Sequence, residues 1–382
     1  MGEALDRLLD LLDLEQIEVN IFRGRSPDDW RQRVFGGQVA GQALVAAGRT
    51  VPADRPVHSL HAYFIRPGDP TVPIVYTVDR VRDGRSFTTR RVSAIQHGKI
   101  IFTLSASFHH PEPGIEHADP MPDAPPPEQV ERNSDRWAKV LGEDHPRVFD
   151  NPFDLRSVGP LPIEAERDPS LRATRNLVWL RVDGELPDDE LLHVCLMTYV
   201  SDMTLLDSVL LAHGLSWLDG HTSGASLDHA MWFHRPFRAD RWLLYAQTSP
   251  VAYGGRGLAR GEVFTAEGEL VVSVVQEGLI RTGFAAECSR RSRRSRFVVT
   301  SRVTVTPDAL AAHVVSEPGT GAPAGPGDID TVSPEPAGGT FLWLRNKRAP
   351  MLLRTSSPCG NRIRPFPELL YELPVGAISV RT

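Results

Sequence analysis

The sequence contains few of the features that mark several classes of protein. Its 382 residues include only three cysteines, and these form no Cys-x-x-Cys pair that would indicate a zinc or redox site. It has no run of 18 apolar residues, so no membrane span is predicted. The first residues lack the basic flank and the long apolar run of a secretory signal. We therefore expect a protein of a reducing compartment, with the cytoplasm as its location.

Over most of the chain, acidic residues outnumber basic ones. The formal net charge is −6, but residues 284–382 carry 13 Lys and Arg against 8 Asp and Glu, which leaves −11 on residues 1–283. A nucleic-acid interface needs a basic surface that displaces counterions. The acidic body therefore argues against a nucleic-acid partner. The content of 41% apolar and 24% charged residues is typical of a globular protein with a packed interior.

The most informative feature that is present is an internal duplication with an offset of about 165–170 residues. Near the start of each copy lies a stretch that we predict to be helical, residues 37–45 and residues 202–210. A strand ending in Phe-x-Arg-Pro follows at Phe64 and at Phe233, an offset of 169. A long hairpin comes last, with a glycine at its turn in both copies.

This order of elements predicts the fold class. One helix followed by several long antiparallel strands, given twice, indicates an α+β protein with a tandem (double) hotdog fold, in which two long antiparallel sheets each wrap around a central helix. Period-2 alternation supports the assignment, because Val272, Val274 and Gln276 share one face of a strand with Leu270. Gln276 is the only polar member of that face.

The chain is predicted to have four parts, since its length exceeds what a single core usually stabilises. They are an N-terminal hotdog domain (1–112), a proline-rich interdomain linker (113–175), a C-terminal hotdog domain with the catalytic polar residues (176–283), and an Arg/Ser-rich and then Pro/Gly-rich extension (284–382). We expect the linker to carry little chemistry. The composition of the extension is typical of disorder, so we expect it to be poorly ordered.

Three positions stand out because they are polar in the second copy and not in the first. With the first-copy residues that they replace, they are Asp202 (Gly36 or Gly37), Ser226 (Val57) and Gln276 (Ala106). Two have a simple structural explanation, because Asp202 can be the N-cap of the second predicted helix and Ser226 can begin a strand. Gln276 is harder to explain in this way, since burying an amide without partners costs about 1–3 kcal/mol. The other two side chains could supply those partners.

Together these side chains suit hydrolysis by an activated water. The carboxylate can accept a proton while the hydroxyl and the amide hold the water in line. A thioester has a good leaving group, so a positioned water with a general base and backbone N–H donors for the oxyanion can suffice. The helix N-terminus expected near Asp202 would offer such donors. This chemistry needs neither a metal nor a cofactor.

Several segments resemble the acyl-CoA thioesterase II family. They lie in order along residues 1–281 and are residues 34–39, 58–69, 228–237 and 275–278. The resemblance implies a double-hotdog subunit that hydrolyses fatty acyl-CoA, in fatty acid metabolism, to the free acid and coenzyme A without a cofactor. It also implies a homo-oligomer, a dimer or larger. The extension at 284–382 has no counterpart in the family.

The resemblance also implies a catalytic Asp, Ser or Thr, and Gln that bind the attacking water. By motif these are Asp202 of the segment 199–202, Ser226 of the segment 225–229, and Gln276 of the segment 275–278. Serine keeps the hydroxyl that threonine has elsewhere in the family, but it lacks the rotamer restriction of a β-branched side chain. We therefore expect it to hold the water less firmly.

Two other kinds of active site fit the sequence poorly. A serine hydrolase of the α/β type needs G-x-S-x-G, and residues 214–218 fail at the last position. A metal site might use His109, His110 and His117, but they lie in or beside the proline-rich segment and include no helical i, i+4 pair.

Two further functions fit the predicted scaffold. An enoyl-CoA hydratase could use Asp228 and His229 as an acid/base pair, although consecutive residues of a strand point to opposite faces. A non-catalytic acyl-CoA-binding protein would tolerate loss of the three polar residues. Coenzyme A carries phosphates, and the arginines considered as their ligands are Arg85, Arg91, Arg235 and Arg256.

Overall fold

The computed structural model describes residues 2–27, 33–142 and 151–283, and two short strands further on. The chain divides into two compact units, Met1–Ser295 and Arg296–Thr382. In the second unit, β14 (Thr340–Arg345) and β15 (Pro350–Thr355) pair as antiparallel strands. The predicted disorder of 284–382 otherwise concerns residues that lie outside the described part of the chain.

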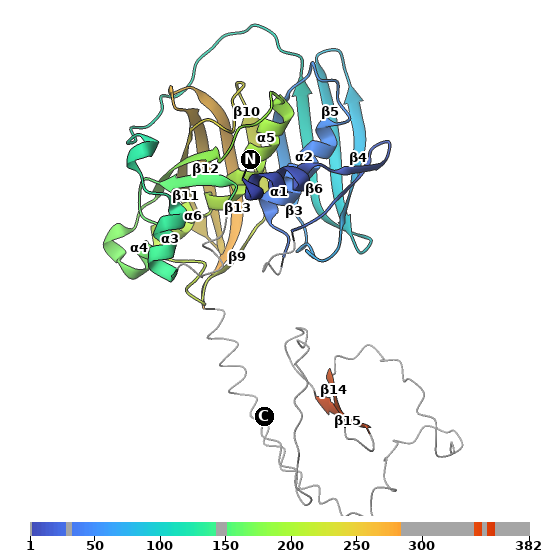
Figure 1. The fold of residues 1–382 in the computed structure, drawn as a ribbon, viewed down its shortest axis with the longest axis vertical. Coiled ribbons are helices and arrows are strands. Elements are labelled where there is room, and N and C mark those ends of the chain that lie inside the picture. The colour runs from blue at the N-terminus through green and yellow to red at the C-terminus, as the bar shows by residue number, and fades with distance from the viewer. Residues whose placement is uncertain (1, 28–32, 143–150, 284–339, 346–349, 356–382) are drawn as a thin grey trace, which may run out of the picture. The chain divides into compact units, whose positions relative to one another are not determined.

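The first half consists of a central helix and strands that curve around it (Figure 1). Its elements are α1 (Glu3–Leu12), β1 (Glu15–Glu18), β2 (Ile21–Gly24), α2 (Gly36–Gly48), β3 (Val57–Phe64), β4 (Ile74–Asp83), β5 (Phe87–Gln96) and β6 (Lys99–His109). α2 is buried along almost its whole length because it is rich in glycine, alanine and valine. β5 and β6 join at His97 and Gly98, which both have positive φ, as a tight hairpin turn requires. The first predicted helix and the hairpin are confirmed.

The segment predicted as a linker has no helix or strand from residue 110 to residue 126, where the prolines cluster. After that it forms η1 (Pro127–Gln129), α3 (Asn133–Leu141), β7 (Phe153–Ser157), α4 (Pro162–Arg167) and η2 (Pro169–Leu171). β7 pairs with the first strand of the second half, so this part of the segment extends the sheet.

The second half repeats the helix and the strands. Its elements are β8 (Arg175–Val182), α5 (Glu190–Thr204), α6 (Asp207–His213), β9 (Ser223–Ser226), β10 (Asp228–Phe233), β11 (Leu243–Tyr253), β12 (Arg256–Thr265) and β13 (Leu270–Arg281). The alternation predicted for β13 is confirmed, because Val272, Val274 and Gln276 are all buried on one face.

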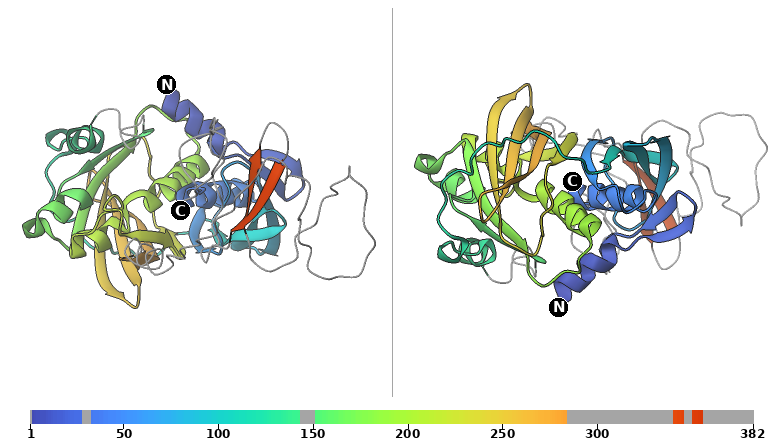
Figure 2. Two further views of the ribbon diagram at one scale, coloured as in Figure 1. Left: turned by 90° about the horizontal axis from the view of Figure 1, so that it is seen from below. Right: turned by 90° about the horizontal axis from the view of Figure 1, so that it is seen from above.

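The strands of both halves form one continuous 13-stranded antiparallel sheet. Their order is β1-β2-β4-β5-β6-β3-β10-β13-β12-β11-β8-β7, and β9 pairs with β13 off this path. The two predicted sheets thus join edge to edge at β3 and β10, where Leu60 pairs with Met231. Figure 2 shows α2 and α5 side by side at the centre, with the strands of each half curving around its helix. This is the predicted tandem hotdog arrangement.

The start of the second central helix was predicted at the wrong place. α5 begins at Glu190, where Asp189 is the N-cap and accepts a hydrogen bond from the backbone N–H of Leu192 over 3.3 Å. It ends at Thr204, so Asp202 lies in its last turn and is not an N-cap. The physical reason is burial. Residues 193–201 are all buried, so the helix has no polar face that would reveal a 3.6-residue period.

Residues Glu190–His213, which span α5 and α6, are long and apolar enough to cross a membrane by length and composition. Most of this stretch is buried inside the protein. α5 packs against α2 and lies within the hydrophobic core. The central helix of a folded domain has the same composition, so this stretch is a core element here.

Candidate active site

The three side chains that distinguish the second copy meet at one carboxylate oxygen. Ser226 Oγ donates a hydrogen bond to Asp202 Oδ1 over 2.8 Å. Gln276 Nε2 donates to the same oxygen over 2.5 Å. Gln276 is fully buried, whereas Asp202 and Ser226 are half-buried. The sequence-predicted site residues therefore form one cluster.

Two strands and a helix position this cluster. Ser226 ends β9 and pairs with Gly278 of β13. Gln276 lies two residues before Gly278, so its side chain points to the same face of the sheet as that of Ser226. That face packs against the junction of α5 and α6. A Cβ at Gly278 would lie 2.5 Å from Leu206 Cδ1, so glycine allows this close approach.

The first half supplies a further partner. The backbone N–H of Gly37, at the start of α2, hydrogen-bonds the Asp202 carboxylate. A Cβ at Gly36 would lie 2.4 Å from Asp202 Oδ2, and a Cβ at Gly37 would lie 2.1 Å from the carbonyl oxygen of Tyr199. The two glycines therefore let the start of α2 approach the last turns of α5. Sequence reasoning singled out this glycine pair but missed its contact with Asp202.

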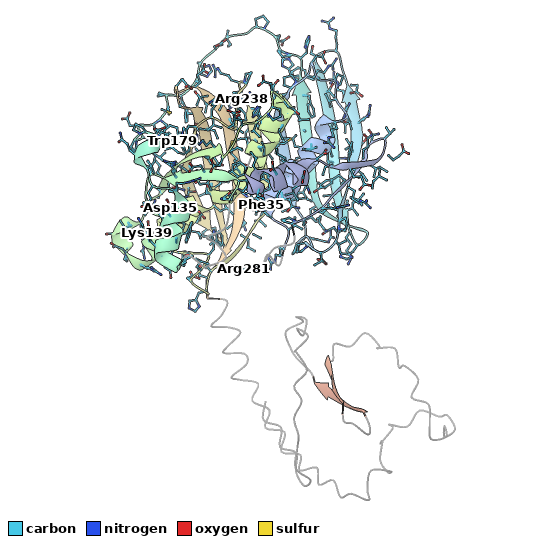
Figure 3. The ribbon with its side chains drawn as sticks, viewed as in Figure 1. Phe35, Asp135, Lys139, Trp179, Arg238 and Arg281 are labelled. Atoms are coloured by element: carbon cyan, nitrogen blue, oxygen red, sulfur yellow. The ribbon has the colours of Figure 1, made fainter. Side chains whose placement is uncertain are left out.

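The helix N-terminus at the site is thus that of α2, and not one beginning near Asp202 as predicted. Phe35 is its N-cap residue and lies where the two halves meet (Figure 3). The Phe35 ring packs edge-on against that of Tyr199 of α5, with 5.1 Å between the ring centroids. The first N–H groups of a helix lack partners within it, so α2 brings backbone donors to Asp202.

Burial raises the pKa of Asp202 to about 6. Hydrogen bonds from Gln276, Ser226 and the Gly37 N–H act in the opposite direction, because they favour the carboxylate. The last turn of a helix carries partial negative charge, which also disfavours ionisation there. A carboxyl group with this pKa is mostly ionised at neutral pH and still basic enough to accept a proton, as general-base catalysis requires.

Asp202 and Ser226 border a cavity of about 180 Å³. The other residues that line it are Met203, Leu206, Asp207, Trp217, Gly224 and Ala225. A single water needs a cavity of only about 10–15 Å³. The space beside the carboxylate can therefore hold a water together with part of a larger molecule.

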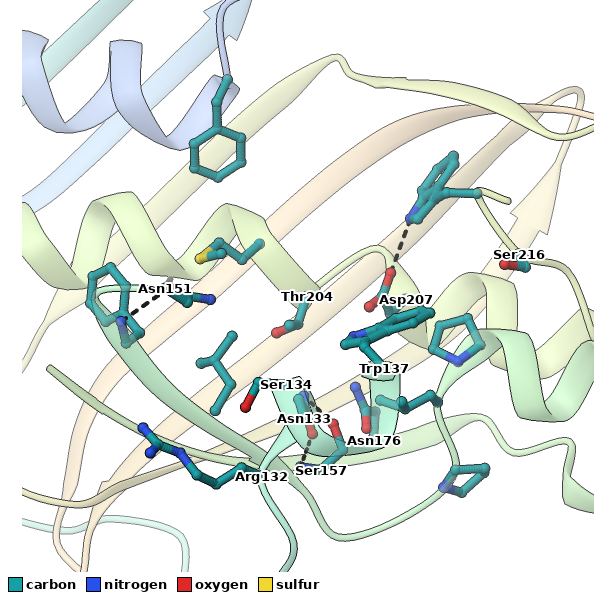
Figure 4. Close-up of a pocket in the computed structure, with 18 of the residues that line it drawn as sticks. Arg132, Asn133, Ser134, Trp137, Asn151, Ser157, Asn176, Thr204, Asp207 and Ser216 are labelled. Carbon is teal, nitrogen blue, oxygen red and sulfur yellow. Dashed lines mark hydrogen bonds between the residues drawn. The ribbon is translucent and has the colours of Figure 1, made fainter. Parts of the chain in front are cut away.

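A larger cavity of about 550 Å³ adjoins the first and shares Met203, Asp207 and Trp217 with it. Trp217 Nε1 donates to Asp207 Oδ1 over 3.0 Å, which fixes part of the shared wall (Figure 4). The volume of the larger cavity is in the range that holds small-molecule ligands. Trp137 and Phe153 from the predicted linker also line it, so this segment contributes to a cavity where little chemistry was expected.

Polar side chains border one part of the larger cavity (Figure 4). Asn176 Nδ2 donates to Gln247 Oε1 over 2.8 Å, and Gln247 Nε2 donates to Thr204 Oγ1 over 2.6 Å. Asn176 and Gln247 are buried, and their mutual hydrogen bonds offset the cost of removing amides from water.

Asp228 and His229, the pair considered for a hydratase, do not face one common site. Asp228 is half-buried and accepts a hydrogen bond from the Glu277 N–H over 2.7 Å. His229 points to the opposite face, where its Nε2 lies 2.8 Å from Ser201 Oγ. The two cannot act as an acid/base pair in one site. Within the described residues, no three His, Cys, Asp or Glu side chains cluster as metal ligands.

Three of the arginines considered for coenzyme A phosphates pair with carboxylates. The pairs are Arg91 with Asp79 at 2.8 Å, Arg235 with Glu116 at 3.6 Å, and Arg256 with Glu277 at 2.8 Å. Surface ion pairs of this kind contribute about 0–1 kcal/mol, so a phosphate could replace the carboxylate at little cost.

Both halves of the chain match families of known proteins. The family described as acyl-CoA thioesterase N-terminal domain matches residues 26–109, and the family described as acyl-CoA thioesterase matches residues 166–279. Acyl-coenzyme A thioesterase 8 of Homo sapiens is 40% identical over 284 residues, covering 71% of this chain and 88% of that protein. Acyl-CoA thioesterase 2 of Haemophilus influenzae is 40% identical over 287 residues, covering 74% of this chain and 99% of that protein.

Solved structures of other proteins are also similar to this chain in sequence and in fold. Acyl-CoA thioesterase II TesB2 from Mycobacterium marinum is 48% identical, has a TM-score of 0.60, and covers 72% of this chain and 98% of its own. A protein from Alicyclobacillus acidocaldarius described as having a hot dog fold is 19% identical with a TM-score of 0.60, and covers 74% of this chain and 99% of its own. These similarities confirm the predicted fold class.

Proposed function

This chain belongs to the acyl-CoA thioesterase family, and we propose that it hydrolyses fatty acyl-CoA with a water that Asp202 activates beside Ser226 and Gln276. The protein is a thioester hydrolase. One observation carries the assignment of these residues. A hydroxyl at 2.8 Å and an amide at 2.5 Å both donate to Asp202 Oδ1, beside a cavity with room for water.

In the proposed reaction, Asp202 takes a proton from a water in the smaller cavity, and the resulting hydroxide attacks the carbonyl carbon of the thioester. The negative oxygen of the tetrahedral intermediate accepts hydrogen bonds from backbone N–H groups in the first turn of α2 other than that of Gly37, which hydrogen-bonds Asp202. Collapse of the intermediate breaks the C–S bond, and the proton held by Asp202 passes to the sulfur. The products are the free acid and the thiol of coenzyme A, and no covalent enzyme intermediate forms.

Ser226 and Gln276 have two roles in this scheme. Their hydrogen bonds to Oδ1 favour the ionised form of Asp202, and so they limit the rise in its pKa that burial causes. They also fix the direction of the carboxylate, which leaves Oδ2 as the oxygen that can reach the water. A base held in one orientation reacts faster because less rotational freedom is lost in the transition state.

The acyl chain extends in this scheme into the cavity of about 550 Å³, because that space shares Met203 and Trp217 with the catalytic cavity. Apolar side chains such as Phe35, Phe153 and Leu155 line part of it. Their contact with a hydrocarbon chain would remove apolar surface from water, which contributes about 25 cal/mol per Å².

The direct test is Asp202→Asn, which removes the base and keeps the size of the side chain. We expect kcat to fall by about 10³-fold, the contribution of a general base, while acyl-CoA still binds. Thiol release measures turnover, and isothermal titration calorimetry measures binding. The matched control is Asp228→Asn, because Asp228 lies on the face of β10 opposite to His229 and accepts the Glu277 N–H there. Its turnover should remain near that of the wild type.

The same pair of variants separates the other functions. A hydratase that used Asp228 and His229 would add water to an enoyl-CoA double bond and lose this activity in Asp228→Asn. A binding protein would release no thiol in any variant. Unchanged thiol release in Asp202→Asn would refute the assignment of Asp202 as the base.

A further inference from the structure

His229 and Gln276 form a buried polar pair whose histidine has no part in the water activation described above. Ala230 of β10 pairs with Val275 of β13, so His229 and Gln276 are the next residues along the two strands. Both side chains point inward, and their exposed fractions are 1% and 0%. Burying two polar side chains next to each other costs free energy unless each one finds its hydrogen-bond partners.

The first half has apolar residues at the two equivalent positions. At the offset of 169–170, the equivalents of His229 and Gln276 are Leu60 and Ala106, which pair with each other across β3 and β6. Both are buried apolar residues. An entire cross-strand pair is therefore polar in the half that carries Asp202 and apolar in the other.

The hydrogen bonds around His229 depend on where one proton lies. His229 Nε2 is 2.8 Å from Ser201 Oγ, and Ser201 Oγ is also 2.9 Å from the carbonyl oxygen of Thr198. The serine hydroxyl has one hydrogen, so it donates to only one of these two acceptors. Within the described residues, His229 Nδ1 and Gln276 Oε1 are buried, and neither atom has a hydrogen-bond partner of good geometry.

The two possible hydrogen-bond arrangements differ in which buried polar atoms they leave without a partner. If Ser201 donates to Thr198, then His229 carries its hydrogen on Nε2, and two acceptors, Nδ1 and Gln276 Oε1, remain buried without a donor. If Ser201 donates to Nε2, then Nδ1 carries the hydrogen and can give it to Gln276 Oε1. An unpaired buried polar atom costs about 1–3 kcal/mol. The second arrangement avoids this cost at both atoms.

We propose that His229 is a positioning residue, which receives the Ser201 hydrogen at Nε2 and donates from Nδ1 to Gln276 Oε1, so that Gln276 Nε2 faces Asp202. The inference rests on the proposed function, because it acts through Gln276 and Asp202. An amide can rotate by half a turn, which would place Oε1 against the Asp202 carboxylate. A donor at Oε1 prevents that rotation and keeps the 2.5 Å hydrogen bond to Asp202.

The charge state of the ring agrees with this role. Burial lowers the pKa of His229 to about 4, and hydrogen bonding between the ring and the Gln276 side chain acts in the opposite direction. The ring is therefore neutral at pH 7, with one hydrogen and one lone pair, as a donor on one side and an acceptor on the other requires.

A double-mutant cycle tests the proposal. His229→Leu installs the residue of the first half, and we expect it to lower kcat about tenfold with little change in KM, the size of coupling found within a hydrogen-bond network. In a Gln276→Ala background the same change should have almost no further effect, because His229 would act only through Gln276. His229→Asn is the matched control, since its amide nitrogen lies close to the position of Nδ1. It should recover most of the lost kcat.

Each result decides the question. An equal loss from His229→Leu in both backgrounds would mean that the histidine only supports packing, and no loss in the wild-type background would mean that it has no role. Turnover unchanged by Gln276→Ala would overturn the proposed function along with this inference. Loss in Gln276→Ala without loss in His229→Leu would overturn the inference alone.

A spectroscopic measurement tests the proposal without an activity assay. In wild-type protein labelled with ¹⁵N-histidine, the ring nitrogen shifts distinguish the two neutral tautomers. We expect the signals that disappear in His229→Asn to be those of the Nδ1–H tautomer, unchanged between pH 6 and pH 8. Signals of the Nε2–H tautomer would overturn the proposal.

Discussion

The two halves of the molecule share one architecture but contribute different parts of the candidate active site. The second half supplies the side chains, and the first half has buried apolar residues at the equivalent positions of its strands. These equivalents are Val57 for Ser226, Leu60 for His229 and Ala106 for Gln276. The first half supplies backbone instead, since the N–H of Gly37 hydrogen-bonds the Asp202 carboxylate.

This division follows from what each half must do. Helix N–H donors require close approach of the helix end, so glycine is favoured there, whereas acid/base chemistry requires side chains. In a fused duplicate, one copy can retain the apolar pairs that stabilise the sheet while the other carries buried polar groups. The site lies where α2 meets α5, and neither half would form it alone.

The comparison is tested most strongly at Gly36, where the backbone of the first half touches the carboxylate of the second. In Gly36→Ala the added Cβ would lie 2.4 Å from Asp202 Oδ2 and 3.0 Å from Phe64 Cε1, so the carboxylate has to move. A displacement near 1 Å can cost about 10²-fold in rate. We expect a loss of kcat of that size in thiol-release assays.

Gly41→Ala is the matched control on the same helix. Its Cβ would find its nearest neighbour, the carbonyl oxygen of Cys195, at 3.3 Å, which a small shift can relieve. Alanine also favours the helical conformation over glycine by about 1 kcal/mol. We expect kcat close to that of the wild type. Equal losses in Gly36→Ala and Gly41→Ala would indicate a general effect on helix packing and not a contact with Asp202.

The sequence predicted much of this site because the duplication allows the two halves to be compared. Asp202, Ser226 and Gln276 were identified as departures from an apolar counterpart, and such a departure in a buried position needs a partner. The same comparison contained His229, which replaces Leu60 at an offset of 169, but the residue was considered only together with Asp228. Period-2 alternation correctly separates those two residues, and the register of β10 with β13 places His229 beside Gln276.

The sequence pattern did not predict what the first half contributes to the site. Asp202 was placed at a helix start because aspartate is favoured at N-caps, although Asp189 with Glu190 after it is the true signal. The contact between α2 and Asp202 depends on how two helices pack, which no local pattern encodes. The helices and the strand at 127–171 were also missed, since the prolines before them suggested an extended linker.

Only the second half buries the carboxylate of Asp202, and this burial predicts an unusual dependence of stability on pH. The folded-state pKa of Asp202 is about 6 against an ordinary 3.8, so the folded protein binds this proton more tightly than the unfolded chain does. The stabilisation is complete below the unfolded pKa and is lost as pH rises through the folded pKa. Relative to Asp202→Asn, the wild type should therefore lose about 2 kcal/mol of unfolding free energy between pH 4 and pH 8.

Urea denaturation of both proteins at pH 4, 6 and 8 measures this difference. Only its change with pH matters, because the two proteins can differ by a constant amount for other reasons. A difference that stays constant, or that moves in favour of the wild type as pH rises, would show that Asp202 does not bind its proton more tightly in the folded state.

The smallest expected effect concerns the hydroxyl of Ser226, whose counterpart in the first half is Val57. Valine and threonine have nearly the same shape, so Ser226→Val and Ser226→Thr isolate the hydroxyl from the added bulk. We expect Ser226→Val to lower kcat about tenfold, the loss of one hydrogen bond to a charged group. Threonine keeps the donor and restricts its rotamer, so kcat should equal or exceed that of serine.

The pH profile makes this comparison more specific. The hydroxyl favours the ionised form of Asp202, so its removal should move the midpoint of the rise in kcat with pH above 6, whereas threonine should leave the midpoint in place. Loss of rate in both variants without a shift would point to crowding beside β9. Full activity of Ser226→Val with an unshifted midpoint would mean that this polar position differs from its apolar counterpart in packing alone.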